Sequence, residues 1–198
     1  MRLAKVLVFL LALLPLAWLV FAVFTGRTSA NPAEDIILTT GIWALRFLLA
    51  SLAITPIRRL TGWHRVIQYR RMLGLFAFFY AVVHVASYIA FDRFFELGEI
   101  WDDVVKRPFI TAGMVAFTCM IPLALTSTRG WIARLGRRWQ LLHRLVYVSA
   151  IAAAVHFVWK VKVVIGEPVY YAAILAVLLL FRVLWIWRSP KARRMRAG

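Results

Sequence analysis

The chain has 198 residues, of which 63% are hydrophobic, and it carries a formal net charge of +17 at pH 7. A soluble domain of this length needs far more polar surface, so the composition excludes one and indicates several membrane-spanning segments. The basic residues lie between the apolar runs rather than on one soluble face, which argues against a nucleic-acid-binding protein. The single cysteine, Cys119, excludes an internal disulfide framework and any cysteine-based zinc or iron–sulfur site.

Six apolar segments follow one another along the chain, each long enough to cross a bilayer core of roughly 30 Å. Irregular backbone cannot face lipid, so each segment is predicted to be a helix. The expected fold is an all-α integral membrane protein, a bundle of six transmembrane helices that forms a single domain over residues 1–198, with no apparent internal repeat. The predicted spans lie at about 6–24, 38–55, 72–91, 109–126, 141–159 and 169–187.

The distribution of charge predicts the topology. All eight acidic residues fall in or near the connectors that follow spans one, three and five. Cytoplasmic segments of membrane proteins carry the excess of Lys and Arg, so both termini are expected in the cytoplasm. The first segment has an apolar run of about 19 residues, longer than that of a signal peptide, and is expected to be retained as a span. The basic residues on the cytoplasmic side are Arg2, Lys5, Arg58, Arg59, Arg65, Arg70, Arg71, Arg129, Arg134, Arg137, Arg138, Arg188, Lys191, Arg193, Arg194 and Arg196.

Three histidines lie in the predicted spans, where an ionisable residue is costly and usually faces the bundle interior or a cofactor. His84 and His156 fall at comparable depths in the outer half of spans three and five. Two neutral imidazoles that face each other across a bundle core can ligate a haem iron from both sides. His143 lies one cofactor layer lower, about 19.5 Å along the same helix as His156. Such histidines also serve as hydrogen-bonding residues between helices, or lie at the interface, as is expected of His64.

Four stretches of the sequence together carry a resemblance to a known family. They read RFLLASLAITPIRRL, YRRMLGLFAFFYAVVHVASY, RPFITAG and LALTSTRGWIARLGRRWQLLHRLVYVSAIAAAVHFVWKVK. On these stretches the chain resembles the MsrQ (YedZ) family, the haem-binding membrane subunits of a bacterial periplasmic methionine-sulfoxide reductase system. That family belongs to the ferric-reductase-like transmembrane superfamily, and the resemblance extends from the first span to the sixth.

The resemblance implies an electron conduit, a redox subunit without a catalytic site of its own. It implies haem b and FMN as cofactors, with electrons that arrive from the quinone pool or from a cytoplasmic flavin reductase. It also implies delivery to MsrP, a periplasmic molybdenum-containing reductase that repairs oxidised methionines, across the bacterial inner membrane. By this resemblance His84 and His156 are the axial ligands of the outer haem, and His143 matches a further histidine of the family.

One departure concerns the inner half of span three. Members of the wider superfamily carry a second histidine there, at positions that are Arg70 and Arg71 in this chain. Arginine stays protonated and cannot ligate iron, so a second bis-histidine haem is in doubt. These arginines, with Arg137 and Arg138, are instead candidates to bind the phosphate of FMN through charge-assisted hydrogen bonds. Trp139 and His143 would border that pocket; the alternative is that the arginines serve topology and contacts with anionic lipid.

Two further arginines lie within spans. Arg46 is deep in span two, where a haem propionate, a carbonyl group or a water-filled cavity would offset its charge, and Arg182 is close enough to the end of span six to extend to the interface.

Competing functions are a cofactor-free transporter or scaffold and a quinone-linked cytochrome of the b561 kind. The first predicts discontinuous helices or substrate-binding acids at mid-membrane. The second requires two complete histidine pairs. The sequence offers one clear pair, together with an acidic outer connector that is a candidate docking site for a partner.

Overall fold

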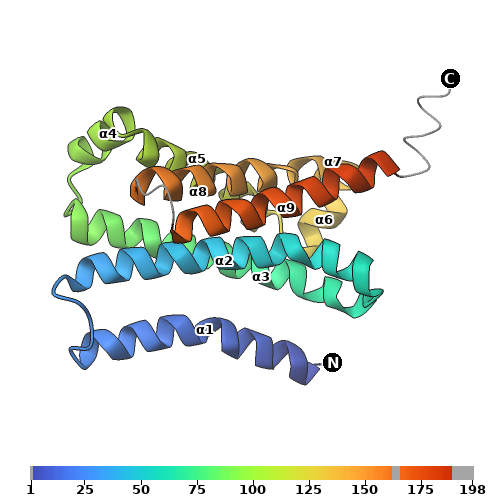
Figure 1. Ribbon diagram of the computed structural model, residues 1–198, viewed down its shortest axis with the longest axis horizontal. Helices are drawn as coiled ribbons and strands as arrows, with labels where there is room; N and C mark the ends of the chain where they lie inside the picture. The colour runs from blue at the N-terminus through green and yellow to red at the C-terminus, as the bar shows by residue number, and fades with distance from the viewer. Residues whose placement is uncertain (1, 162–165, 189–198) are drawn as a thin grey trace.

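The computed structural model describes residues 2–161 and 166–188, and in these residues it contains helices and connecting turns but no strand (Figure 1). The predicted all-α class is therefore confirmed. Four basic residues assigned to the cytoplasmic tail, Lys191, Arg193, Arg194 and Arg196, lie outside the described residues. The helices are α1 (Arg2–Phe24), α2 (Pro32–Thr61), the 3₁₀ turn η1 (His64–Val66), α3 (Ile67–Ser87), the π-helical turn η2 (Tyr88–Asp92), α4 (Leu97–Lys106), α5 (Pro108–Leu125), α6 (Arg129–Leu135), α7 (Arg137–Leu142), α8 (Leu145–Val161) and α9 (Glu167–Arg188).

Six helical segments in the described part of the chain are long and apolar enough to cross a membrane, as the sequence predicted. Each overlaps one predicted span, and several extend further. The prediction of one continuous helix over 141–159 was wrong, because a turn at His143 and Arg144 separates α7 from α8. The six segments are Leu3–Phe24, Pro32–Thr61, His64–Asp92, Pro108–Leu125, Arg137–Val161 and Glu167–Trp185.

Local signals in the sequence fix where the longest helix begins and ends. Asn31 caps the N-terminus of α2, because its side chain accepts a hydrogen bond from the backbone N–H of Glu34. Pro32 follows in the first turn, where its missing N–H costs nothing. Gly62 ends α2 in the left-handed conformation, with φ of 69°, which glycine adopts without a steric penalty. Pro108 starts α5 in the same way as Pro32 starts α2.

The bundle is organised as two closely packed helix pairs, α2 with α3 and α5 with α8. Helix α9 packs against α8 and α2, and α1 lies along the outer side of the α2–α3 pair (Figure 1). The hydroxyl of Tyr80 joins α1 to α3, since it donates to Ala12 O at 2.9 Å and accepts from Leu16 N at 3.1 Å. It enters the α1 backbone beside Pro15, where the proline already interrupts the helical hydrogen bonds.

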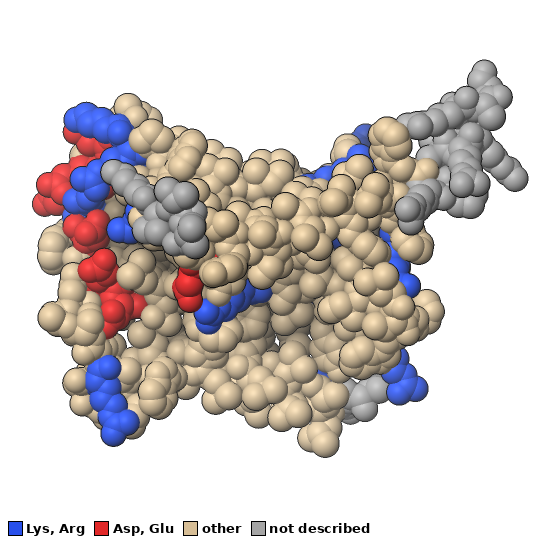
Figure 2. All heavy atoms as spheres, in the orientation of Figure 1, with Lys and Arg blue, Asp and Glu red and all other residues tan. Residues whose placement is uncertain are grey.

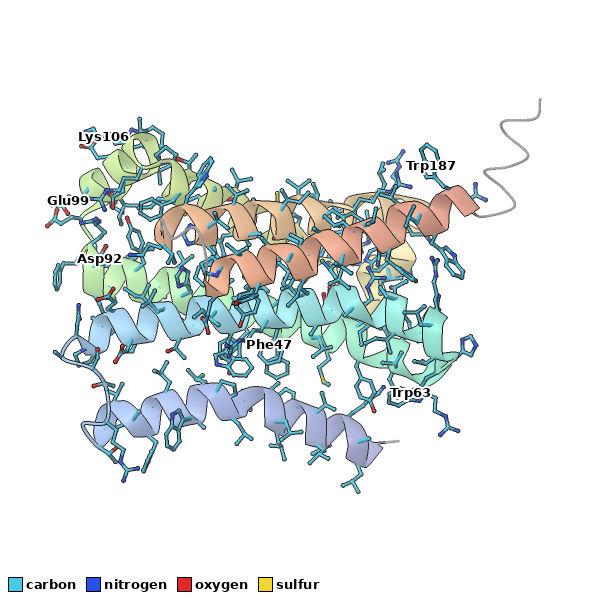
Figure 3. The ribbon with its side chains drawn as sticks, in the orientation of Figure 1. Phe47, Trp63, Asp92, Glu99, Lys106 and Trp187 are labelled. Carbon is cyan, nitrogen blue, oxygen red and sulfur yellow. The ribbon has the colours of Figure 1, made fainter. Side chains whose placement is uncertain are left out.

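The two ends of the bundle differ in charge. The start of α1 and the end of α9 lie at one end, and α4 lies at the other (Figure 1). Acidic side chains gather at the end that carries α4 (Figure 2), and Figure 3 shows Asp92, Glu99 and Lys106 there, with Trp63 and Trp187 at the opposite end. We call these the α4 end and the η1 end. The arrangement matches the one-sided acidity that the sequence predicted.

Candidate functional site

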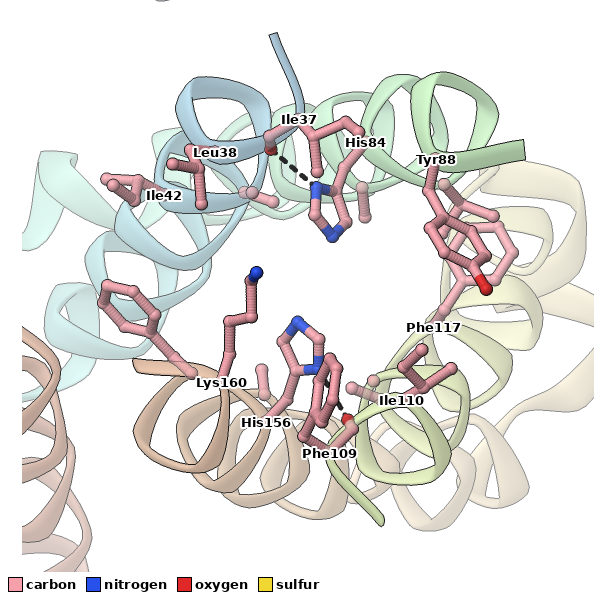
Figure 4. Close-up of a pocket in the computed structure, with 18 of the residues that line it drawn as sticks. Ile37, Leu38, Ile42, His84, Tyr88, Phe109, Ile110, Phe117, His156 and Lys160 are labelled. Atoms are coloured by element: carbon pink, nitrogen blue, oxygen red, sulfur yellow. Dashed lines mark hydrogen bonds between the residues drawn. The ribbon is translucent and has the colours of Figure 1, made fainter. Parts of the chain in front are cut away.

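A cavity of about 460 Å³ lies between the α2–α3 pair and the α5–α8 pair, towards the α4 end (Figure 4). Its volume falls within the range of about 300–1,000 Å³ that is typical of small-molecule and cofactor sites. Most of the wall is apolar, with Leu48, Phe117 and Met120 among the residues that line it. The polar groups are concentrated on two facing histidines and at the mouth near α4.

His84 and His156 face each other across this cavity, as the sequence predicted for a pair at comparable depths (Figure 4). Their ring centres are 6.1 Å apart and the ring planes are inclined by 77°. Nδ1 of His84 lies 2.8 Å from the carbonyl oxygen of Ile37, and Nδ1 of His156 lies 2.6 Å from that of Phe109. A carbonyl can only accept, so each Nδ1 carries the proton and donates it. Each Nε2 is then left with a lone pair available for a metal, the arrangement typical of ligating histidines.

The two histidines sit in two copies of one structural arrangement. Both hydrogen bonds join residues 47 positions apart, from α3 to α2 in one pair and from α8 to α5 in the other. In each pair a glycine follows the accepting residue by one helical turn, and these glycines are Gly41 and Gly113. A Cβ on Gly41 would lie 2.9 Å from Nδ1 of His84, and one on Gly113 would lie 2.8 Å from Nδ1 of His156. The two helix pairs thus share one local arrangement around their histidines.

The donor set fits a haem iron. Metal–imidazole bonds are about 2 Å long, so an iron bound to both Nε2 atoms holds the two ring centres about 6 Å apart. The observed separation is 6.1 Å. In residues 2–161 and 166–188 no group of three or more His, Cys, Asp or Glu side chains is placed to hold a bare metal ion. Two protein ligands suffice for haem because the porphyrin supplies the other nitrogens.

A polar network that sequence reasoning missed lies beside the cavity, and three of its members, Tyr88, Arg93 and Arg107, line it. Asp103 on α4 is only 7% exposed, and it accepts hydrogen bonds from Tyr88 at 2.7 Å and Arg93 at 2.6 Å. Arg107 pairs with its other oxygen at 3.0 Å. Burial alone would raise the pKa of Asp103, but the hydrogen bonds from Tyr88 and Arg93 and the charges of Arg93 and Arg107 lower it overall. The sequence showed acids and arginines close together in this connector but not which of them meet.

A second group of predicted residues meets at the η1 end. His143 and Trp139 stack with ring centres 3.8 Å apart, and both are tied to Thr126, through the Nε2 of His143 at 3.1 Å and the Nε1 of Trp139 at 2.9 Å. Arg70 is half-buried and close enough for its charge to act on His143. The structure therefore brings Arg70, Trp139 and His143 together. The predicted pocket also included Arg71, Arg137 and Arg138. All three are exposed, and none forms a hydrogen bond or ion pair with another described residue.

The remaining predicted residues lie away from the cavity. Arg46 donates from Nε to the hydroxyl of Tyr171 at 2.7 Å and packs over Trp43, so the structure does not bring it to the cavity wall. Arg182 packs over the ring of Tyr147. His64 is exposed in η1, as expected for a residue at the interface.

The comparisons with known proteins agree on one family. The family model of the ferric reductase like transmembrane component matches residues 40–154. The protein-methionine-sulfoxide reductase heme-binding subunit MsrQ of Herminiimonas arsenicoxydans is 49% identical and aligns with 100% of this chain and 92% of its own length. The proteins of the same name from Rhodospirillum rubrum and Xanthomonas euvesicatoria are 48% and 49% identical, over 100% and 98% of this chain and 93% and 90% of their own. No solved structure matches. The chain belongs to the MsrQ family and carries the ferric reductase-like transmembrane component that this family shares.

Proposed function

We propose that this chain is the electron-transfer subunit of a methionine-sulfoxide reductase system in the bacterial inner membrane. It carries electrons through haem b, and through FMN, to a periplasmic molybdenum-containing reductase of the MsrP type. The donor is the quinone pool or a cytoplasmic flavin reductase. The chain itself holds and orients the cofactors, and the reduction of methionine sulfoxide takes place in the partner.

The observation that carries this proposal is the pair of imidazoles at 6.1 Å, each with its Nδ1 proton donated to a backbone carbonyl. His84 and His156 would be the axial ligands of haem b. When bound, the haem iron accepts and gives up one electron at a time. The backbone carbonyls fix the tautomer and orientation of each ring, and the apolar wall would keep water from a bound iron. A protein sets a haem potential through these two features.

The charge pattern supports an orientation with the η1 end in the cytoplasm and the α4 end in the periplasm. The cavity then lies in the outer half of the membrane, close to the surface that a periplasmic partner would approach. That position suits the last cofactor of a chain that delivers electrons outwards. Both termini are cytoplasmic in this orientation.

A flavin site at the η1 end is supported by polar groups that have no partner there. Three buried side-chain groups lack a hydrogen bond to any described residue. They are the Oγ1 of Thr55, the Oε1 of Gln68 and the Nη2 of Arg182. Buried polar groups are normally satisfied, so they favour a polar occupant. Arg70 would bind the FMN phosphate, assisted by Arg71, Arg137 and Arg138, and the stacked pair of Trp139 and His143 would border the flavin ring.

The test is to purify the chain in detergent, record oxidised and reduced visible spectra, and quantify haem and released flavin per chain. We expect one haem and one FMN per chain in the wild type. His84→Ala and His156→Ala should each remove the low-spin haem spectrum, while His64→Ala should retain it. The double variant Arg70→Ala/Arg71→Ala should lose flavin and keep haem. A wild-type chain without haem would refute the electron-transfer role, and a double variant with full flavin content would refute the FMN site alone.

A further inference from the structure

Lys160 is placed to bind a carboxylate of the occupant of the cavity. It lies on α8 one helical turn after His156, so both side chains leave the helix on the same side. Figure 4 shows its ammonium group reaching over the cavity beside His156, and the side chain is one of those that line the cavity.

The ammonium of Lys160 has no ionic partner among the described residues. Two other basic side chains line the cavity, Arg93 and Arg107, and both are paired with Asp103, at 2.6 Å and 3.0 Å. Arg93 is further engaged by Asp92 and Glu99. Within the part of the chain that the structure describes, Lys160 is therefore the cation at this cavity whose charge no carboxylate balances.

The α2–α3 pair and the α5–α8 pair differ in the residue that lies one helical turn after the histidine. Tyr88 follows His84 by one turn, as Lys160 follows His156, so the two residues are equivalent in the shared local arrangement. The Tyr88 hydroxyl is already bonded to Asp103. At one of these two positions the polar group is thus bonded within the protein, and at the other a cation without an ionic partner among the described residues lines the cavity.

We propose that Lys160 anchors a propionate of the haem through a charge-assisted hydrogen bond, and that it thereby fixes the rotation of the haem about the line between His84 and His156. This inference rests on the proposed haem site. A carboxylate brought into an apolar cavity without a partner is strongly disfavoured, and an ammonium group at the mouth offsets that cost. Lys160 takes the role that the sequence suggested for Arg46, whose guanidinium is bonded to Tyr171 instead. Lys160 is a positioning residue and not a ligand of the iron.

The test compares Lys160→Met and Lys160→Arg with Lys106→Met as a control. Lys106 lies at the same end of the bundle, pairs with Asp102 and does not line the cavity, so its loss removes the same charge without touching the site. In Lys160→Met we expect haem to dissociate to a scavenging protein about tenfold faster or more, the effect of losing one charged hydrogen bond. The midpoint potential should also fall, because the lost positive charge no longer disfavours the ferric state. Lys160→Arg should restore both properties, and Lys106→Met should change neither.

A second experiment separates binding of the propionate from packing. The full chain is produced under haem limitation and then loaded with haemin or with haemin dimethyl ester, whose propionates carry no charge. With the ester, wild type and Lys160→Met should lose the cofactor at the same rate. A difference that persists with the ester, or a Lys160→Met variant that matches wild type with haemin, overturns this inference while the haem site stands. A wild-type chain that takes up no haemin overturns the proposed function and this inference together.

Discussion

Gly41 faces the imidazole of His84 so closely that a Cβ atom on the glycine would lie 2.9 Å from Nδ1. Gly113 stands in the same relation to His156, at 2.8 Å. Real Cβ contacts are not this short, so a larger residue must displace the ring. The ring cannot move without losing its hydrogen bond to the backbone carbonyl of the opposite helix. The absence of a side chain at these two positions is thus a condition for the orientation of both ligands.

Gly41→Ala and Gly113→Ala should therefore each lower the haem content of the purified chain severalfold while the chain still inserts and folds. The measurement is the haem to protein ratio, with the low-spin spectrum as a second readout. Gly74→Ala is the matched control, because a Cβ there meets nothing within 4 Å. Alanine is favoured over glycine inside a helix by about 1 kcal/mol, so this control should bind haem fully and be as stable as wild type or more so. Full haem occupancy in Gly41→Ala would contradict the close packing.

Tyr80→Phe should loosen α1 from the rest of the bundle without affecting the haem site. Tyr80 is 1% exposed, and its hydroxyl provides both a donor and an acceptor to the α1 backbone. Its loss leaves buried backbone groups unsatisfied, which costs about 1–3 kcal/mol. The measurement is the free energy of unfolding by SDS titration in mixed micelles. Tyr170→Phe, at a side chain that is 64% exposed, is the control and should leave it unchanged.

The number and order of the membrane-spanning segments could be predicted from the sequence because they depend on local composition. An apolar run of about 20 residues in lipid has only one stable backbone conformation. The pairing of His84 with His156 was predictable for a related reason, since an imidazole in such a run needs a partner and these two lie at similar depths. Depth follows directly from the position in a span, whereas the direction of a side chain around the helix does not.

What could not be predicted depends on contacts between helices distant in sequence. Arg46 has a suitable depth for a propionate, but the packing of α2 against α9 turns it towards Tyr171. The meeting of Asp103 with Tyr88 depends on how α4 folds back against the π-helical turn η2. The break at His143 is equally invisible in the apolar pattern, because a turn of two residues hardly alters the hydropathy of the segment.

Asp103→Asn should loosen α4 from its contacts with Tyr88, Arg93 and Arg107. The variant keeps the shape of the side chain but loses the charge that binds Arg93 and Arg107. Charged hydrogen bonds contribute about 1.5–3 kcal/mol, so amide hydrogen exchange in residues 97–106 should rise about tenfold or more at neutral pH. Asp102→Asn is the control, since Asp102 is exposed and, among the described residues, pairs only with Lys106 one turn away. Equal exchange in both variants would show that the network does not hold α4.

The same network predicts a dependence on pH. The pKa of Asp103 is lowered in the folded chain, so its contribution to stability is present above the unfolded value of about 3.9 and is lost as the pH falls through the lower folded value. Protection of α4, corrected for intrinsic exchange, should therefore remain constant from pH 7 to about pH 5 and decline only below about pH 4. Asp103→Asn should lack this decline. A loss of protection near pH 6 would point to a histidine instead.

His143→Ala should reduce the flavin content and leave the haem content unchanged. His143 does not face a second imidazole, because its ring stacks on Trp139 and its Nε2 is bonded to Thr126. Arg70 is close enough for its charge to act on this ring, and an arginine cannot ligate iron. The measurement is haem and flavin per chain after purification, with His64→Ala, an exposed histidine at the same end, as the control. A variant in which haem falls by half would instead mean that His143 ligates a second haem, and the η1 end would then hold iron rather than flavin.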